Sequence, residues 1–289
     1  MLRQTGAGVL CFARRDGEPW LLLGRERQTP GWRQGSEKWS SFSGKVEVHE
    51  SALEGAAREF FEESCASVPL TGELPNDLDD VQRALEQHAC EIQQRSEAKG
   101  ELLSYSTFVI NVPFDSFPER FAVVRARLVE LDQVFREFYK QKKQSEAVPR
   151  FFLPGFNLSP NLLVADFQVT QSEVAVTLHQ DEEEIEVVFG INAQLCELLQ
   201  NLQRTWRAIK SYIAASISDP IFKHPAVQVQ RSHGQVISAY INKSFLEKSD
   251  LAWFPLSELL SNRQPWSANE SPFRKLFLEN IASIASHIL

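Results

Sequence analysis

The chain has 289 residues, of which 43% are hydrophobic and 24% charged, and its formal net charge at pH 7 is −8. These fractions are ordinary for a globular protein with a buried core, and they argue against disorder. The negative charge argues against unspecific attraction of nucleic acid to the whole surface.

The sequence also bears on where the protein acts. No apolar run approaches the roughly 20 residues of a membrane-spanning helix, and the first residues contain no apolar stretch of signal-peptide length. We therefore expect neither export nor a membrane partner. Cys11, Cys65, Cys90 and Cys196 show no CxxC pair and no zinc-type spacing. We expect free buried thiols in a reducing, intracellular compartment: the cytoplasm, the nucleus, or an organelle after removal of a transit peptide.

The N-terminal residues predict a hairpin followed by a loop. Residues 7–15 and 18–26 are largely apolar and flank Asp16 and Gly17, two residues that favour a tight turn. Residues 28–44 are rich in Gly and Ser and predict a loop that ends in a short strand over 39–43.

A helix is predicted to follow this loop. Apolar residues recur at helical spacing from Leu53 to Phe61 and form its buried face. Ser51 and Glu54 match a capping box, so we expect the helix to begin there.

The rest of the chain is read from the same signals. The expected elements, in chain order, are a helix over 81–98, a strand over 102–114, a long amphipathic helix over 118–144, a loop over 149–172, two strands over 173–180 and 183–191, a helix over 193–217 and a terminal helix over 272–288. No internal repeat and no flexible linker interrupts this order. We expect a single domain over residues 1–289, with insertions at about 70–100 and 115–235.

Two segments are locally basic. Residues 116–145 carry seven Lys or Arg against four acidic residues, and residues 201–233 carry five against Asp219 alone. Most such excesses are solvated helix faces, but two basic helices in a large insertion could also extend a groove for RNA.

Residues 44–66 carry the most chemical information. Glu59, Glu62 and Glu63 crowd one turn of the predicted helix, where like charges repel unless cations neutralise them. Such an unfavourable arrangement is typical of a binding site. Hard divalent cations prefer carboxylate and carbonyl oxygens, and they allow an acidic cluster to accept a phosphate chain.

This stretch resembles the signature of Nudix hydrolases: a glycine, five residues, Glu, seven residues, Arg-Glu, an apolar residue, any residue and Glu-Glu. The match runs through Gly44, Glu50, Arg58, Glu59, Phe60, Glu62 and Glu63. The resemblance implies an α/β fold, the Nudix-type α/β/α sandwich with a mixed sheet, here enlarged by mainly helical insertions. It also implies a metal-dependent pyrophosphohydrolase.

The resemblance further implies how the site residues divide their work. Mg²⁺ or Mn²⁺ would be bound by Gly44 through its carbonyl and by the carboxylates of Glu59, Glu62 and Glu63. Glu50 would support the site by pairing with Arg58.

Catalysis is assigned to side chains near the metal and to one distant acid. Family members often supply a further acid from a later segment, and residues 247–260 resemble the late strand and turn of Nudix domains. Glu247 is our candidate for that acid. The candidate catalytic residues are therefore Glu59, Glu62, Arg58 and Glu247.

The candidate substrate-binding residues are Lys45, Trp39 and Arg25. The pair Gly44-Lys45 resembles members that cleave dinucleoside polyphosphates and RNA caps. Trp39 and Tyr105 could stack a base, although packing in a loop or core is the commoner use of such side chains.

The chain departs from the family pattern at the end of the signature. Cys65 stands where the family has a second glycine, and Ala66 stands at the last apolar position. That glycine closes the helix, so the departure concerns backbone geometry more than metal chemistry.

Two functions stay open. The first is an enzyme that cleaves a nucleoside diphosphate linked to another group, with a lean to nucleoside polyphosphates or RNA 5′ ends; sugar nucleotides, dinucleoside polyphosphates and inositol pyrophosphates also fit the motif. The second is a catalytically weak or inactive Nudix-like binding or scaffold subunit that docks RNA or a protein partner. A protein partner or a second copy could bind through the insertion in either case.

Overall fold

The structure is a computed structural model that describes residues 2–32, 35–71, 77–98, 101–152, 162–180, 183–232, 235–261 and 271–289. The chain forms two compact units, one of Met1–Val129 with Asn242–Leu289 and one of the residues between them. The expectation of a single domain with insertions stays a prediction. None of the helices in the described ranges combines the length and apolarity that a membrane crossing needs.

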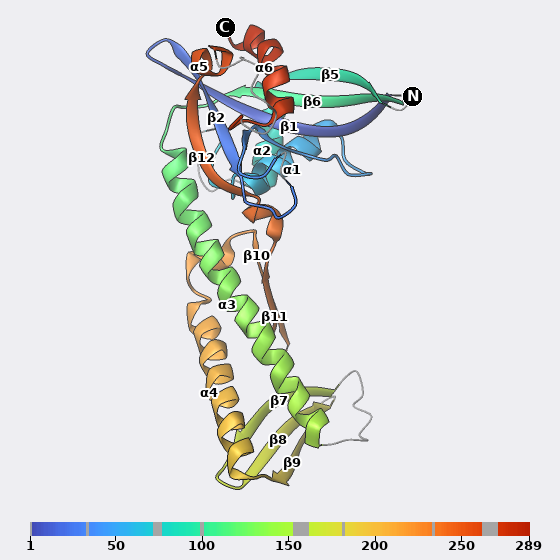
Figure 1. Cartoon of the computed structure of the whole chain (residues 1–289), viewed down its shortest axis with the longest axis vertical. Helices are drawn as coiled ribbons and strands as arrows, with labels where there is room; N and C mark the ends of the chain where they lie inside the picture. Colours follow the sequence, from blue (N-terminus) through green and yellow to red (C-terminus); the bar gives the residue numbers. More distant parts are fainter. Residues whose placement is uncertain are drawn as a thin grey trace. The chain divides into compact units, whose positions relative to one another are not determined.

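A mixed sheet forms the centre of the first unit. Its strands are β1 (Leu2–Arg15), β2 (Glu18–Glu26), β3 (Trp39–Ser40), β4 (Phe42–Gly44), β5 (Cys90–Ala98), β6 (Glu101–Asn111) and β12 (Lys248–Pro255). The long strands lie in the order β12-β2-β1-β6-β5, with β3 beside β2 and β4 beside β1. β1 and β6 run parallel, whereas the other pairs run antiparallel. β12 thus brings the last part of the chain back beside β2 (Figure 1).

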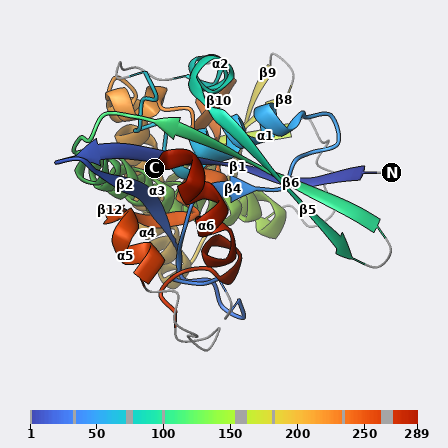
Figure 2. The ribbon, with the colours of Figure 1, turned by 90° about the horizontal axis from the view of Figure 1, so that it is seen from above.

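Helices cover both faces of this sheet, as Figure 2 shows. On one side lie α1 (Ala52–Glu63) and α2 (Leu78–His88), and on the other lie α5 (Leu256–Ser261) and α6 (Lys275–Ile288). Because side chains alternate between the faces of a strand, Leu21 and Leu23 of β2 share a buried cluster with Ile281 of α6. Leu22 between them is equally buried and points to the opposite face. The expected α/β/α sandwich is confirmed.

The predicted hairpin is confirmed, with its turn at the expected residues. Arg15 pairs with Glu18, which leaves Asp16 and Gly17 as the two turn residues. Their φ angles are 52° and 83°. Positive φ at both positions suits the twist of a two-residue hairpin, and Gly and Asp adopt it more easily than most residues.

The helix expected over residues 81–98 is wrong in its second half. α2 ends at His88, and Cys90–Ala98 forms β5, which pairs with β6 along its length. The polar side chains of this segment imitate a solvated helix, but hydrogen bonding to β6 outweighs their weak intrinsic preference. The strand expected over 102–114 is confirmed as β6, and the terminal helix is confirmed as α6.

The second unit contains both helices and strands. The long helix α3 (Phe117–Phe152) begins in the first unit and continues into the second. The other elements are β7 (Leu162–Val169), β8 (Glu173–Gln180), β9 (Glu183–Gly190), α4 (Ala193–Ser216), the 3-10 helix η1 (Pro220–Lys223), β10 (Val227–Ser232) and β11 (Gln235–Ile241). Phe138 of α3 packs on Trp206 of α4, with ring centroids 5.2 Å apart. Phe121, Phe135 and Phe138 of α3 are buried, as expected for the apolar face of an amphipathic helix.

The loop expected over residues 149–172 is partly wrong. α3 continues to Phe152, and Leu162–Val169 forms β7, while residues 153–161 lie outside the described ranges. β7 gains its hydrogen bonds from β8. Such a pairing depends on a partner strand, which local composition does not reveal. The strands expected at 173–180 and 183–191 and the helix at 193–217 are confirmed.

Candidate active site

The loop after β4 and the first turn of α1 frame the site. Gly44 ends β4, and Ser51 caps α1. The Ser51 hydroxyl accepts a hydrogen bond from the Glu54 N–H at 3.2 Å, and the Glu54 carboxylate accepts one from the Ser51 N–H at 2.7 Å. The predicted capping box is confirmed. It fixes where the helix begins and therefore which residues face the sheet.

The apolar face of α1 decides where its charged residues lie. Phe60 is fully buried and meets Phe42 of β4 edge to face, with ring centroids 5.0 Å apart. Apolar side chains occupy the face of α1 that packs on the sheet. Arg58, Glu59 and Glu62 therefore lie at the edge of this buried face, next to Gly44 and the loop that follows it.

Arg58 contacts three acidic side chains. Its Nε lies 2.6 Å from Glu50 Oε1 and its Nη2 lies 3.1 Å from Glu50 Oε2, while Nη1 lies 2.8 Å from Glu59 Oε1 and 3.4 Å from Glu62 Oε2. Nη2 also donates to the Lys45 carbonyl at 2.9 Å. The hydrogen bonds with Arg58 lower the pKa of Glu50, and those with Glu50 raise the pKa of Arg58. The guanidinium stays charged and orients the carboxylates around it.

Glu59 lies directly against Gly44. A Cβ added to residue 44 would stand 2.2 Å from both Cδ and Oε1 of Glu59. Since real Cβ atoms do not approach other atoms so closely, the glycine is required by the close contact of the carboxylate with the backbone.

Glu62 and Glu247 lie close enough to Glu59 to repel it. Glu247 follows the 3-10 helix η2 (Lys243–Leu246) and precedes β12. Burial raises the pKa of both carboxyls. The negative charge of Glu59 raises the pKa of both Glu62 and Glu247 further. The pKa of Glu62 is also raised by Glu247 and lowered by Arg58. A set of partly buried carboxylates in mutual repulsion is stabilised by a cation.

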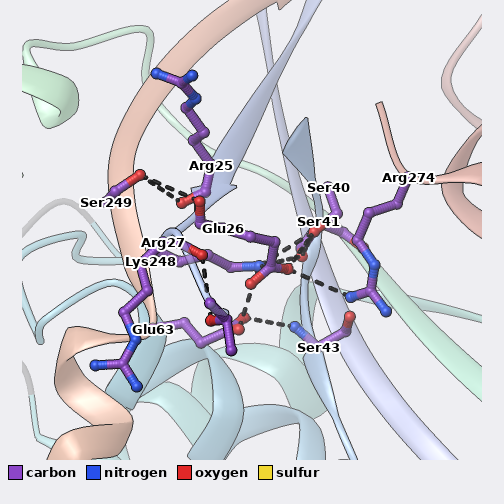
Figure 3. Close-up of polar contacts among 11 residues, drawn as sticks. Arg25, Glu26, Arg27, Ser40, Ser41, Ser43, Glu63, Lys248, Ser249 and Arg274 are labelled. Carbon is purple, nitrogen blue, oxygen red and sulfur yellow. Dashed lines mark hydrogen bonds and ion pairs between the residues drawn. The ribbon is translucent and has the colours of Figure 1, made fainter. Parts of the chain in front are cut away.

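Glu63 points into a buried ion-pair network instead (Figure 3). Its Oε2 accepts a hydrogen bond from the Ser43 N–H at 2.7 Å, and its Oε1 lies 3.2 Å from Lys248 Nζ. Lys248 Nζ lies 2.6 Å from Glu26 Oε1. Burial raises the pKa of Glu63, against the effect of Lys248. Burial alone would lower the pKa of Lys248, but Glu63 and Glu26 raise it, so the lysine is charged.

The three predicted substrate-binding residues have different surroundings. Lys45 lines a pocket beside Gly44. Trp39 packs edge-on against Phe254, with ring centroids 5.1 Å apart. Arg25 donates through Nε to the Glu37 carbonyl at 3.1 Å. The roles of all three in substrate binding stay predictions.

The pocket beside Gly44 has a volume of about 300 Å³ and is lined by residues of the sheet and of α6. Lys45 and Arg274 supply positive charge, and no acidic side chain is found among the lining residues that the structure describes. Leu276 provides apolar surface, and Asn280 provides an amide. The pocket therefore suits a group that carries both negative charge and apolar surface.

Sequence reasoning missed Lys248, Glu26 and Arg274. Lys248 begins β12 opposite Glu26, and its stem passes over Gly24, where a Cβ would come within 2.9 Å of it. A signal was present at Gly24, because an isolated glycine in a strand often marks a close approach. The identity of the approaching side chain depends on the pairing of β12 with β2, which the sequence does not display.

The residues fit a divalent cation in charge and in donor type. Glu59, Glu62 and Glu247 offer carboxylate oxygens, which Mg²⁺ and Mn²⁺ prefer, and their mutual repulsion favours a cation among them. In the described ranges no three Asp, Glu, His or Cys side chains converge on one point. Glu59 and Glu62 pair with Arg58 instead, and Glu63 pairs with Lys248.

A mixed sheet between helices, with a glutamate-rich helix held against a glycine, defines an α/β protein of the Nudix class. Residues 2–151 match the family model described as the NUDIX domain, which is more than half of the 289 residues. The chain belongs to the Nudix family. Glu247, β12 and α6 lie beyond the matched residues.

Several solved structures are similar to this chain. An Ap4A hydrolase from C. elegans, in a binary complex, is 22% identical over 38% of this chain and 66% of its own, with a TM-score of 0.25. The Nudix hydrolase RenU from M. smegmatis is 17% identical over 40% of this chain and 64% of its own, with a TM-score of 0.25. MERS1 from T. brucei, in a complex with RNA, is 15% identical over 38% of this chain and 35% of its own, with a TM-score of 0.26. The chain thus spans less than two thirds of each of these proteins. No curated protein matches it.

Proposed function

We propose that this chain is a metal-dependent pyrophosphohydrolase that cleaves a nucleoside diphosphate linked to another group. The observation that supports this most strongly is the placement of Glu59 directly against Gly44, with Glu62 and Glu247 close enough to Glu59 for its charge to act on both. Burial and neighbouring carboxylates raise the pKa of Glu62 and Glu247, so a bound cation would stabilise their charged forms and would also assist phosphoanhydride hydrolysis.

Each residue then has a separate task. When bound, Mg²⁺ or Mn²⁺ polarises phosphate oxygens and makes a bound water more acidic. Glu59 and Glu62 would hold the ion together with the Gly44 carbonyl. Glu247 accepts a proton from the attacking water at its carboxylate, a task that suits a carboxyl whose pKa lies above its ordinary value. Arg58 keeps Glu59 and Glu62 in one orientation.

Glu50 completes the arrangement around Arg58. Its two oxygens pair with Nε and Nη2 of Arg58, which leaves Nη1 directed at Glu59 and Glu62. A planar guanidinium held at two points has little freedom to turn. Glu50 therefore acts through Arg58 and does not touch the substrate.

The pocket beside Gly44 is proposed to hold one nucleotide of the substrate. Lys45 and Arg274 would bind its phosphates, and Leu276 and Phe277 would contact the nucleoside. A volume of about 300 Å³ suits one nucleotide and not a longer chain. In an RNA 5′ end, further nucleotides would lie outside this pocket; the locally basic segments 116–145 and 201–233 are separate candidates for contact with RNA.

The alternative is a binding or scaffold subunit that keeps the fold without turnover. It is favoured by the contacts of the acids, because Arg58 and Lys248 already neutralise three of the glutamates that the family uses for metal. In that case the chain would bind RNA or a protein partner, and added metal would not change its affinity.

Hydrolysis of a panel of substrates with Mg²⁺ or Mn²⁺ tests the proposal. The panel contains nucleoside triphosphates, dinucleoside polyphosphates, ADP-ribose, sugar nucleotides, inositol pyrophosphates, and triphosphorylated and capped RNA. Glu62→Gln is measured beside the parent, and Glu47→Gln serves as a control that removes an exposed carboxylate from the same segment.

We expect metal-dependent cleavage that Glu62→Gln abolishes and Glu47→Gln retains. Equal activity of the parent and Glu62→Gln would contradict the assignment of the metal site. Silence of the folded parent across the whole panel would favour the binding subunit.

A further inference from the structure

Lys248 is a fully buried lysine between two buried glutamates. Its side chain has 0% exposure, and those of Glu26 and Glu63 have 6% and 3%. Nζ also donates to the Ser40 hydroxyl at 3.1 Å and to the Ser41 carbonyl at 3.4 Å. Figure 3 shows these groups gathered around one ammonium. A lysine without solvent contact is kept charged only by such a complete set of acceptors.

Both oxygens of Glu63 are engaged within this network. Oε2 accepts the Ser43 N–H at 2.7 Å, and Oε1 faces the Lys248 ammonium at 3.2 Å. A metal bound to Glu63 would have to share an oxygen with the Ser43 N–H or with the ammonium, and it would compete with them for the same negative charge. Loss of either contact would leave a buried polar group without its partner.

Lys248 is held so that it cannot turn away. Its stem packs over Gly24, where a Cβ would come within 2.9 to 3.1 Å of three of its carbons. Its carbonyl accepts a hydrogen bond from Arg125 Nε at 2.6 Å, and β12 pairs with β2 at Glu26. The neighbouring Glu247 carbonyl accepts the Arg27 N–H at 2.8 Å. With its backbone fixed and its stem enclosed, the ammonium stays beside Glu63.

The charges on this side of the site are already balanced. Glu26 and Glu63 face Lys248, and Arg274 Nη1 lies 3.3 Å from Glu26 Oε1. Two carboxylates thus meet two cations. A divalent ion at Glu63 would stand next to a buried ammonium, which is unfavourable where water cannot screen the repulsion.

We infer that Lys248 is a built-in counter-ion that removes Glu63 from the set of metal ligands. The inference rests on the proposed function, in which Glu59 and Glu62 bind the metal with the Gly44 carbonyl. Glu63 is then a positioning residue, which ties the last turn of α1 to Ser43 of β4 and to the first residue of β12. This tie keeps Glu62 at the end of α1 beside Glu247, the residue that precedes Lys248.

Binding of Mn²⁺ alone, followed by electron paramagnetic resonance in the full chain, tests the inference. We expect the parent to bind Mn²⁺ and Glu62→Gln to lose about tenfold or more in affinity, as loss of a ligand requires. Glu63→Gln should stay within about threefold of the parent, since its amide oxygen can still accept the Ser43 N–H. A loss in Glu63→Gln as large as in Glu62→Gln would overturn the inference and leave the proposed function standing. No Mn²⁺ binding by the parent would overturn the proposed function and the inference with it.

Thermal unfolding without metal provides the second readout. Lys248→Met should lower Tm strongly, because it leaves Glu63 and Glu26 buried together without their ammonium. The double variant Lys248→Met with Glu63→Gln should regain part of that loss, and its Mn²⁺ affinity should remain within about threefold of the parent. If the single variant Glu63→Gln does not fold, the double variant takes its place in the Mn²⁺-binding test. A double variant that is no more stable than Lys248→Met, or that loses Mn²⁺ as Glu62→Gln does, would overturn the inference.

Discussion

The carboxylate of Glu59 lies so close to the α-carbon of Gly44 that a methyl group between them would stand 2.2 Å from Glu59 Cδ. Gly44→Ala should therefore push Glu59 out of its place and lower both kcat and Mn²⁺ affinity, with kcat falling about 100-fold if the carboxylate moves by about 1 Å. Steady-state kinetics and Mn²⁺ titration measure the two effects.

Gly190→Ala is the matched control for this substitution. A Cβ at residue 190 would have its nearest neighbour at 4.0 Å, so no displacement is expected. The close contact would be disproved if Gly44→Ala kept the parent's kcat and Mn²⁺ affinity.

Arg58 meets Glu50 at two points and also reaches Glu59 and Glu62, which a lysine cannot reproduce. Arg58→Lys keeps the charge but replaces a planar group with a single ammonium. We expect kcat to fall about 10–100-fold, the usual cost of losing a group that orients metal ligands, with a smaller change in KM. Arg83→Lys on α2 is the control, because Arg83 is an exposed arginine that pairs with one aspartate, Asp80. Similar kinetics of the two variants would contradict a positioning role for Arg58.

Features of the site that depend on neighbouring residues could be predicted from the sequence. The buried ion pairs between residues far apart in the sequence could not. The capping box at Ser51 and the hairpin turn at Asp16 depend on residues a few positions apart, and both are confirmed. The salt bridge of Lys248 with Glu26 joins residues from the two ends of the chain. It exists because β12 pairs with β2, and nothing local to Lys248 distinguishes it from an exposed lysine.

The same reasoning explains the error at β5. Residues 90–98 form the second half of the helix expected over 81–98. Their actual conformation is set by β6, with which Cys90 and Ala98 pair at the two ends of the ladder. Strand preference depends on the neighbouring strand more than helix preference depends on its surroundings.

Cys65 ends α1 in the conformation that the family's glycine would adopt. Its φ is 53° and that of Ala66 is 50°. The Cys65 N–H bonds the Glu62 carbonyl at 3.0 Å, and the Ala66 N–H bonds the Phe61 carbonyl at 2.8 Å, which is the Schellman pattern of a helix end. The departure from the signature therefore changes the residue and not the backbone.

Cys65→Gly should change stability by no more than about 1 kcal/mol. It relieves a left-handed conformation that costs about 1–2 kcal/mol in a residue with a Cβ, but it loses a buried thiol that donates to the Phe245 carbonyl at 2.9 Å. Cys65→Val should destabilise the protein by about 2 kcal/mol or more, because a branched side chain tolerates positive φ poorly. Thermal unfolding measures both. A Cys65→Gly variant as unstable as Cys65→Val would show that the thiol contact outweighs the strain.

Glu54 and Glu62 lie on the same helix and have pKa shifts of opposite sign. The Ser51 N–H lowers the pKa of Glu54, whereas burial raises that of Glu62. Because its pKa is lowered, Glu54 is more readily charged in the folded state than in the unfolded state. Its carboxylate therefore stabilises the fold above pH 4.5, and this stabilisation is lost as the pH falls through the folded pKa of Glu54. Because its pKa is raised, Glu62 is more readily protonated in the folded state than in the unfolded state. The protonated carboxyl stabilises the fold below pH 4.5, and this stabilisation is lost as the pH rises through the folded pKa of Glu62.

The metal-free protein should therefore respond in opposite ways to two matched substitutions. At pH 7 in EDTA, Glu62→Gln should raise Tm, because the folded state no longer has to bury that charge, and Glu54→Gln should lower it. The Glu62→Gln difference should shrink as the pH falls through the raised folded pKa of Glu62 toward 4.5, whereas the Glu54→Gln difference should shrink only as the pH falls from 4.5 through the lowered folded pKa of Glu54. Added Mn²⁺ should stabilise the parent and Glu54→Gln but not Glu62→Gln, since only the last lacks a proposed ligand. If both substitutions moved Tm in the same direction at pH 7, Glu62 would not be the unfavourably buried charge that a cation is expected to neutralise.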